Sequence, residues 1–595
     1  MYRTASRDGS LAVLKRRGGC AIVSGIMSRQ PTDGVPATPP LLRSIGLIAL
    51  AVSFAVRLFY LFMGEFNEDE MNTLQMAWQF ANGVVPYLDT AGFRPPWSFF
   101  ILRPLFAFFD RPTHIIWAAR AMQLALSAAG LGFYFLFVDR LAGRRAAWWS
   151  LIAVSCFDFF VVRTTQVRAE PLLLLLLFAA LYLFARWRAD AGRLPAVFFA
   201  GLLLGAAVVT KYSAPFVALA PGVVLVIDAF TRRGRRRESL FAALLLAGGA
   251  VVAIVGTMML ASGGRWFAAL KHIWLIAHGL RITEGQHGTN WFVLSTFITN
   301  PLFWMLAVVG FVYGHVRLAV LWRRRQPAWP VGLLLLLGWF SLAMILVRKS
   351  LFQQDLILPG LLLTPLAAML LVRRIPLPLT SPRRRGGAVA ILVAVMLVVP
   401  LLGGVAYERF TTQRTIGYYT EVVAHFWNAR TPPAKRVAVD TEQFLAFLEG
   451  EHDWIHYYPV RSFRQSLALT KRISELTDPG EYVLSQAGHG IVRPEPLRVI
   501  KTQVVADLLK FDPKGSHALC RALRPFMPGM CDPTFTPGRR ALTALEQHPP
   551  RLIVFSYAVA DLVAKQPETR AWVAENYRVW FEPATLTFFG KPREP

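Results

Sequence analysis

The chain has 595 residues, of which 54% are hydrophobic, and its formal net charge is +28 at pH 7. A soluble chain of this length is normally less apolar, so the composition excludes an ordinary soluble globular protein. The positive charge does not indicate a nucleic-acid-binding protein. The Arg clusters fall between long apolar segments, where they serve membrane topology.

The first 40 residues are polar, with scattered Arg and Pro. They contain no apolar core followed by a small-residue cleavage site, so we predict no signal peptide. We expect 1–40 to form a disordered cytoplasmic N-terminus. Met27 is an alternative start of the chain, and the sequence does not decide between the two.

Long apolar segments recur from residue 41 onward, and as helices they can cross about 30 Å of hydrocarbon. We predict about eleven transmembrane helices, at 42–63, 114–138, 147–163, 169–186, 195–211, 214–230, 239–261, 295–321, 331–348, 355–372 and 387–406. The predicted fold class is therefore an α-helical polytopic membrane protein, with a transmembrane domain over 41–406.

The loops between these segments alternate in charge. One set contains Arg tracts such as "TRRGRRRE", and the other contains the acidic stretch "NEDE" at 67–70. The positive-inside rule places the Arg-rich loops in the cytoplasm, so the acidic stretch and everything after about 407 lie outside. The apolar segment 97–109 is too short to span. Counting it as a span would invert every later loop, so we predict an interfacial or re-entrant helix there.

The tail, 407–595, mixes strand and helix patterns. "EYVLSQ" (481–486) and "RLIVFSY" (551–557) are typical of buried strands, whereas "SFRQSLALTKRISEL" and "TRAWVAENY" are typical of helices. We predict a small α/β domain outside the cytoplasm. Cys520 and Cys531 both lie in it, and in an oxidising compartment this pair predicts a disulfide.

Two predicted outer loops carry acids and cations at the same membrane depth. Asp69 and Glu70 follow the first helix and precede Arg94-Pro-Pro, while Arg168 and Glu170 stand at the entrance of the fourth helix. Charges at the head of a long Leu run cost free energy unless they face a polar cavity. Two plainer interpretations stay open: a solvated loop carboxylate, and for Lys211 a lysine that snorkels to the interface.

This arrangement suits the transfer of a sugar from a polyprenyl phosphate. The lipid tail would lie in the bilayer and the phosphate at the interface. A carboxylate must accept the proton of the attacking hydroxyl. Cations must stabilise the charge that grows on the departing phosphate, and Arg94, Arg168 and Lys211 are candidates.

These residues resemble the motifs of the GT-C superfamily of integral-membrane glycosyltransferases. The most similar branch holds the protein O-mannosyltransferase-like enzymes and the lipid A aminoarabinose transferases. The resemblance covers about 42–400 and rests on four segments in the same order and topology: "DEMNTLQMAWQFANGVVPYLDTAGFRPPW", "VRAEPLLLLLLF", "GLLLGAAVVTKYSA" and "FQQDLILPGLLLTPLAAML".

The resemblance implies roles for individual residues. Asp69 would be the catalytic carboxylate, and Glu70 would orient it or the sugar. Arg94 and Lys211 would contact the lipid phosphate, and Glu170 would be the acid of the second outer loop. Glu170 stands where Asp is common in the family. Asn72 stands where aminoarabinose transferases tend to have a basic residue, which argues against that specificity.

We predict no metal ligand set. His272, His278 and His287 in the outer stretch 262–294 do not have the spacing of a helical metal pair. No cofactor is firmly predicted, although a divalent metal stays open.

The predicted function is a glycosyltransferase of the inner (plasma) membrane, with Asp69 as general base. It would act on the outer face, using a polyprenyl-phosphate-linked sugar and an acceptor hydroxyl on a glycan, a lipid or a protein. The sequence does not name the sugar or the acceptor. One alternative is a transporter or flippase of lipid-linked sugars, although the sequence lacks the paired repeats typical of transporters. The other is a binding module on a membrane anchor.

Overall fold

The structure, a computed structural model, describes residues 40–63, 68–86, 95–190, 193–211, 213–231, 236–270, 296–347, 353–374, 426, 436–449, 463–485, 490, 492–494, 537–555, 557–564, 566–585 and 587–594. Several predicted features lie outside these residues: segments 1–39 and 387–406, Arg94, His272, His278, His287, Cys520 and Cys531.

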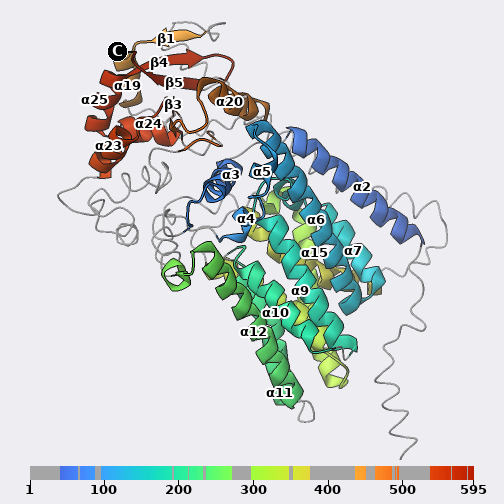
Figure 1. Cartoon of the computed structure of the whole chain (residues 1–595). Coiled ribbons are helices and arrows are strands. Elements are labelled where there is room, and N and C mark those ends of the chain that lie inside the picture. Colours follow the sequence, from blue (N-terminus) through green and yellow to red (C-terminus); the bar gives the residue numbers. More distant parts are fainter. Residues whose placement is uncertain are drawn as a thin grey trace, which may run out of the picture.

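The predicted transmembrane segments up to residue 372 coincide with helices (Figure 1). Among the described residues, seven helices are long and apolar enough to cross a membrane. They are α2 (Pro40–Met63), α6 (Pro112–Ala142), α9 (Glu170–Asp190), α11 (Ala214–Thr231), α12 (Arg236–Ala261), α15 (Pro301–Arg323) and α16 (Trp329–Val347). The chain is therefore a multi-pass, mainly helical membrane protein, as predicted.

Three predicted spans are not long unbroken helices: two are short, and one is broken in two. α10 (Pro195–Val208) and α17 (Ile357–Arg374) are shorter, and α17 is preceded by the 3-10 turn η3 (Gln353–Leu356). The segment 147–163 is broken into α7 (Arg144–Ser155) and α8 (Asp158–Arg163). The break occurs because the backbone of Phe157 is extended, with φ −83° and ψ 103°.

The apolar segment 97–109 does not form a span. It contains two short helices, α4 (Trp97–Phe100) and α5 (Leu105–Phe108), with Pro96 and Pro104 at their N-caps. The indole nitrogen of Trp97 donates a hydrogen bond of 3.0 Å to Thr257 Oγ1 near the end of α12. The segment is thus held against one end of the bundle, in keeping with the predicted interfacial or re-entrant helix.

The helices pack closely where small residues meet. A Cβ added to Gly201 or Gly205 of α10 would lie 2.2–2.3 Å from the carbonyl oxygens of Leu246 and Ala250 in α12. Small residues permit this close approach, which is how helices associate in a bilayer without a hydrophobic driving force between them. This packing fixes the end of α10, and therefore the start of the loop that carries Lys211.

The tail contains a small sheet covered by helices (Figure 1). In the described part of the tail the strand order is β1-β4-β5-β3-β2, and β2 pairs with β3 in parallel whereas the other pairs are antiparallel. The strands are β1 (Val437–Val439), β2 (Val483–Leu484), β3 (Leu552–Phe555), β4 (Tyr577–Glu582) and β5 (Thr587–Pro592). The helices are α19 (Thr441–Glu449), α20 (Phe463–Leu476), α23 (Pro537–Gln547), α24 (Tyr557–Ala564) and α25 (Pro567–Asn576).

This C-terminal sheet region contacts α3 (Glu68–Ala81), which follows α2, and its helix α20 packs against α6 and α2 (Figure 1). Leu467 and Val492 from the tail pack against the apolar cluster that contains Leu74 of α3. The side-chain amide of Gln75 donates a 2.7 Å hydrogen bond to the backbone oxygen of Arg493. The tail therefore contacts the helix that carries the predicted catalytic carboxylate.

Candidate active site

Glu70 joins three segments at one end of the bundle. It lies in the first turn of α3, where carboxylates are favoured by the helix dipole. Its two carboxylate oxygens accept hydrogen bonds of 2.7 and 2.9 Å from the Arg120 guanidinium, and Oε2 also accepts one of 2.9 Å from the Val167 backbone N–H. Arg120 in turn donates to the backbone oxygen of Leu61 in α2. Both charged side chains are fully buried, so the pair ties α2, α3 and α6 to the loop 164–169.

Asp69 sits beside this pair but has a different environment. Its Oδ2 lies 2.8 Å from Nη2 of Arg168, and 35% of its side chain is exposed. Thr73, one turn further along α3, donates a 2.6 Å hydrogen bond to the Asp69 backbone oxygen. Asp69 is thus held at the start of the helix by backbone contacts, while its carboxylate reaches an accessible surface.

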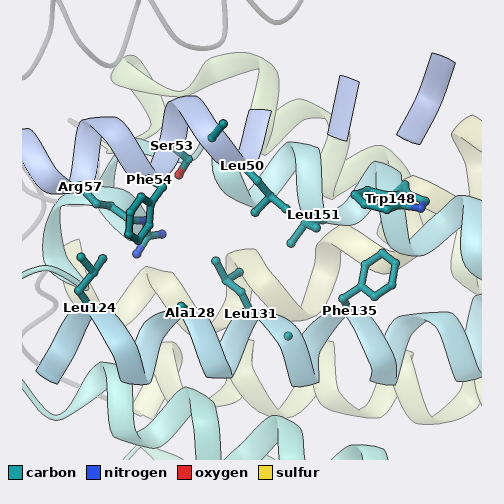
Figure 2. Close-up of a pocket in the computed structure, with 12 residues that line it drawn as sticks. Leu50, Ser53, Phe54, Arg57, Leu124, Ala128, Leu131, Phe135, Trp148 and Leu151 are labelled. Atoms are coloured by element: carbon teal, nitrogen blue, oxygen red, sulfur yellow. The ribbon is translucent and has the colours of Figure 1, made fainter. Parts of the chain in front are cut away.

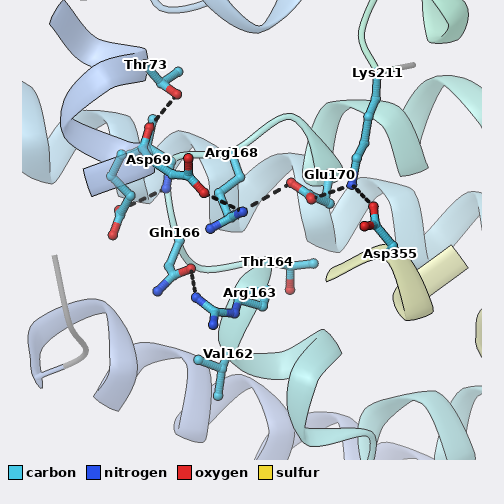
Figure 3. Close-up of polar contacts among 12 residues, drawn as sticks. Asp69, Thr73, Val162, Arg163, Thr164, Gln166, Arg168, Glu170, Lys211 and Asp355 are labelled. Atoms are coloured by element: carbon cyan, nitrogen blue, oxygen red, sulfur yellow. Dashed lines mark hydrogen bonds and ion pairs between the residues drawn. The ribbon is translucent and has the colours of Figure 1, made fainter. Parts of the chain in front are cut away.

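A row of alternating charges continues from Arg168 across the site (Figure 3). Arg168 Nε lies 3.6 Å from Glu170 Oε2, and Glu170 Oε1 accepts a 2.7 Å hydrogen bond from Lys211 Nζ. Lys211 Nζ also lies 3.7 Å from Asp355 Oδ1. We call Asp69, Arg168, Glu170, Lys211 and Asp355 the charge row.

The members of the charge row stand at or close to the ends of secondary-structure elements. Glu170 begins α9, and Asp355 lies in η3 directly before α17. Lys211 follows α10, where its backbone N–H donates 3.2 Å to the Ala207 oxygen, and the neighbouring Val209 oxygen accepts from the Trp97 backbone N–H. A small pocket lies beside Glu170, Lys211 and Asp355. Helix ends from distant parts of the chain therefore build one polar site at the head of the bundle.

The neighbouring carboxylates favour the charged form of Arg168. Burial acts to lower the pKa of Arg168, but the carboxylates of Asp69, Glu170 and Glu70 outweigh it and raise that pKa above its ordinary value. Arg168 is therefore a fixed cation between two carboxylates. Three carboxylates of the charge row face two cations, so the row by itself has a surplus of negative charge. Within the described residues, no group of three or more His, Cys, Asp or Glu side chains is arranged to hold a metal ion.

Comparison with known proteins finds a matching family model and solved structures with a similar architecture. Residues 93–262 match the family model of dolichyl-phosphate-mannose-protein mannosyltransferases. The solved structure of ArnT from Cupriavidus metallidurans bound to undecaprenyl phosphate is similar to this chain. Its TM-score is 0.55 at 16% identity, over 93% of this chain and 98% of ArnT. The chain has the GT-C fold.

Two other solved structures are similar to this chain at lower scores. The apo form of the same ArnT has a TM-score of 0.46 at 14% identity, covering 91% of this chain and 97% of ArnT. The Archaeoglobus fulgidus oligosaccharyltransferase AglB, in complex with an inhibitory peptide and a dolichol-phosphate, also has a TM-score of 0.46. Its identity is 12%, over 93% of this chain and 74% of AglB. A search of the curated proteins found no match.

The GT-C structure brings together most of the residues singled out in the sequence. Asp69, Arg168, Glu170 and Lys211 lie in the charge row, and Glu70 lies directly behind it. Two residues were missed. Asp355 stands at the head of an apolar helix, as Glu170 does, and the same rule would have found it. Arg120 interrupts the apolar α6, and an intramembrane charge is itself a signal of a polar partner.

Proposed function

We propose that this protein is a membrane glycosyltransferase that moves a sugar from a polyprenyl phosphate to an acceptor hydroxyl, with Asp69 as general base. The observation that carries the proposal is the exposure of Asp69. Its side chain is 35% exposed, whereas those of Glu170 and Asp355 are 6% and 1% exposed. A general base must come within hydrogen-bond reach of the proton that it removes. Among the carboxylates of the charge row, Asp69 fits this requirement best.

In the proposed reaction the acceptor oxygen attacks the anomeric carbon of the sugar. The proton of the hydroxyl goes to Asp69, and the bond between the anomeric carbon and the phosphate oxygen breaks. The polyprenyl phosphate leaves with the bonding electrons. The attack and the departure occur on opposite faces of that carbon, so the transfer inverts its configuration.

The departing phosphate needs cations, and Arg168 and Lys211 are the described candidates. Guanidinium and ammonium groups form strong charge-assisted hydrogen bonds to phosphate. Glu170 and Asp355 hold Lys211 in place, and Glu170 also contacts Arg168. Because the charge row has a surplus of negative charge, we propose that Arg94 of the same outer loop adds a third cation.

The choice of donor rests on the comparisons as well as on the site. The ArnT structure that shares this fold holds undecaprenyl phosphate, and the matching family is described by a dolichyl-phosphate-linked sugar. We infer a polyprenyl-phosphate-linked sugar as the donor class here. The acceptor is a glycan, a lipid or a protein, and we propose no particular sugar.

We further propose that the charge row faces the outside of the cell membrane and that the N-terminus is cytoplasmic. The supporting observation is the separation of charges along the bundle. The charge row lies where α9 and α17 begin and where α10 ends. The Arg-rich ends of α6, α9 and α15, with Arg140, Arg188 and Arg323, lie at the opposite ends of their helices. The positive-inside rule then assigns those ends to the cytoplasm.

The proposal is tested by Asp69→Asn in the purified protein, with Asp110→Asn as the matched control. Comparing the glycans and lipids of cells with and without the gene identifies the donor and the acceptor. Transfer of a labelled sugar is then measured in nanodiscs. Asp69→Asn should lower turnover by about 10²–10⁴-fold, the usual contribution of a positioned base. Asp110 is exposed and precedes α6, outside the charge row, so its variant should transfer normally.

Two outcomes would contradict the proposal. If Asp69→Asn keeps normal turnover while Glu170→Gln abolishes it, the base lies in the second outer loop. If the wild-type protein transfers no sugar from the lipid donor, the function is transport of the lipid-linked sugar, which is measured by its movement across proteoliposomes.

A further inference from the structure

A large apolar groove lies apart from the charge row, between α2, α6 and α7 (Figure 2). Its volume is about 520 Å³, and its walls include Leu50, Leu131 and Trp148. Among its lining residues, only Ser53 and Arg57 have polar side chains apart from the indole of Trp148. A groove of this composition suits a hydrocarbon chain.

The groove opens sideways between the helices. Phe54 of α2 and Gly132 of α6 both line it and are both exposed at the outer surface of the bundle. Along the transmembrane helices α2 and α6 this surface faces the bilayer. An occupant therefore enters from the lipid phase and has a lipid chain.

Arg57 supplies a buried cation at one end of the groove. Its side chain is buried, and its guanidinium lies 4.6 Å from the centre of the Phe160 ring. Nη1 donates to Thr164 Oγ1, whereas Nη2 is buried and has no hydrogen-bond partner in the described part of the chain. A charged group inside a membrane protein costs free energy unless it is paired. This guanidinium can therefore bind an anion through Nη2.

The depth of Arg57 fits a lipid phosphate. Arg57 precedes the end of α2 at Met63 by six residues, which is a rise of about 9 Å. From Arg57 the groove follows α2 toward the middle of the membrane as far as Leu50, about 10 Å deeper. A lipid with its phosphate on Arg57 would thus lay the upper part of one chain along the groove.

We propose that the groove binds one anionic phospholipid, from the leaflet on the side of the charge row, with its phosphate on Nη2 of Arg57. A phospholipid suits the site better than the sugar donor, because Arg57 contacts neither Arg168 nor Lys211. Thr164, which receives the other hydrogen bond of Arg57, begins the loop 164–169 that leads to Arg168. The bound lipid therefore braces the loop that carries a cation of the proposed donor site.

The test measures lipid retention by native mass spectrometry after the protein is released from nanodiscs. The nanodiscs contain phosphatidylglycerol and phosphatidylcholine in equal amounts. The wild-type protein should keep one phosphatidylglycerol and prefer it over phosphatidylcholine. Arg57→Gln should reduce retention about tenfold, as expected for the loss of a charge-assisted hydrogen bond. Arg103→Gln is the matched control, because Arg103 is an exposed arginine between α4 and α5, outside the groove.

A second pair of variants fills space without removing charge. A Cβ at Gly132 would meet no atom within 4 Å, so Gly132→Leu extends into the groove and should displace the lipid. Gly248 in α12 has equally open surroundings, and Gly248→Leu should leave the lipid bound. This pair keeps the test decisive if Arg57→Gln does not fold.

Three results would overturn the proposal. The first is equal retention of both phospholipids in the wild-type protein. The second is unchanged retention in Gly132→Leu. The third is displacement of phosphatidylglycerol by inorganic phosphate or by undecaprenyl phosphate at equal concentration, which would assign the site to a free anion or to a lipid carrier. None of these lipid-retention measurements depends on sugar transfer, so their outcome is independent of the proposed function.

Discussion

Arg120 holds Glu70 through two hydrogen bonds of 2.7 and 2.9 Å, in full burial, next in the chain to the partly exposed Asp69. Asp69 and Glu70 of "NEDE" thus have opposite environments. Glu70 faces inward to a fixed partner, and Asp69 faces the site. Because Glu70 also accepts from the Val167 N–H, the pair sets the distance between Asp69 and Arg168.

Separating this pair should reveal a positioning role. Arg120→Met leaves a buried carboxylate without its cation and should lower the free energy of unfolding by about 3–5 kcal/mol. The double variant Glu70→Met with Arg120→Met removes both charges and should recover most of that stability. Its sugar transfer should stay low, because Val167 loses its acceptor. Thermal unfolding in detergent and transfer rates on the same samples check this. Normal transfer by the double variant would show that the pair serves stability alone.

Lys211 should matter for the donor more than for the acceptor. Lys211→Met leaves Glu170 and Asp355 facing each other without the ammonium group between them. We expect a higher KM for the donor and a lower kcat, whereas Lys211→Arg keeps the charge and should retain part of the activity. Arg94→Ala should also raise the donor KM. Steady-state kinetics with each substrate varied in turn separate these effects. Lys471→Met, at a side chain that is 71% exposed in the tail, is the control.

The proposed orientation of the chain in the membrane can be tested by cysteine labelling of intact cells. Residue 234 is expected inside, as is Arg324 between α15 and α16, whereas Lys471 of α20 is expected outside. In a variant without the natural cysteines, an impermeant maleimide should label Lys471→Cys at once. Arg324→Cys should react only after permeabilisation. Labelling of Arg324→Cys in intact cells would reverse the orientation and move the site to the cytoplasm.

The predicted disulfide between Cys520 and Cys531 lies outside the described residues and stays a prediction. Mass spectrometry of non-reduced peptides should find the two joined. Reduction should destabilise the tail by about 2–4 kcal/mol, as expected from loop constraint, and leave the helices in place. Two free thiols in protein purified without reductant would refute the pairing.

The transmembrane helices were predictable because hydropathy is a local signal. Any helix that crosses the bilayer must satisfy its own backbone and present apolar side chains. The break between α7 and α8 was not predicted, because no Gly or Pro marks it; Cys156 and Phe157 stand there. In the tail, the strands at 483–484 and 552–555 were expected. The pairing of β5 between β3 and β4 was not, because strand order depends on contacts between distant residues.

The site was predictable to the extent that its members stand at helix ends. Asp69, Arg168, Glu170 and Lys211 were found by charges that cost free energy next to apolar segments. What the sequence did not contain was the order of contacts. That Arg168 lies between two carboxylates, and Lys211 between two others, follows from the packing of α3, α9, α10 and α17.

The hydrogen bond between Gln75 and Arg493 joins residues that are 418 positions apart. A ribosome that adds about 5–20 residues per second needs about 20–80 seconds to make the second partner after the first. During that interval α3 has already been synthesised, but the tail that packs against it does not exist. The contact between α3 and the tail therefore forms only after the described bundle helices have been made. A chain that stops before Arg493 would hold the charge row without this contact between α3 and the tail.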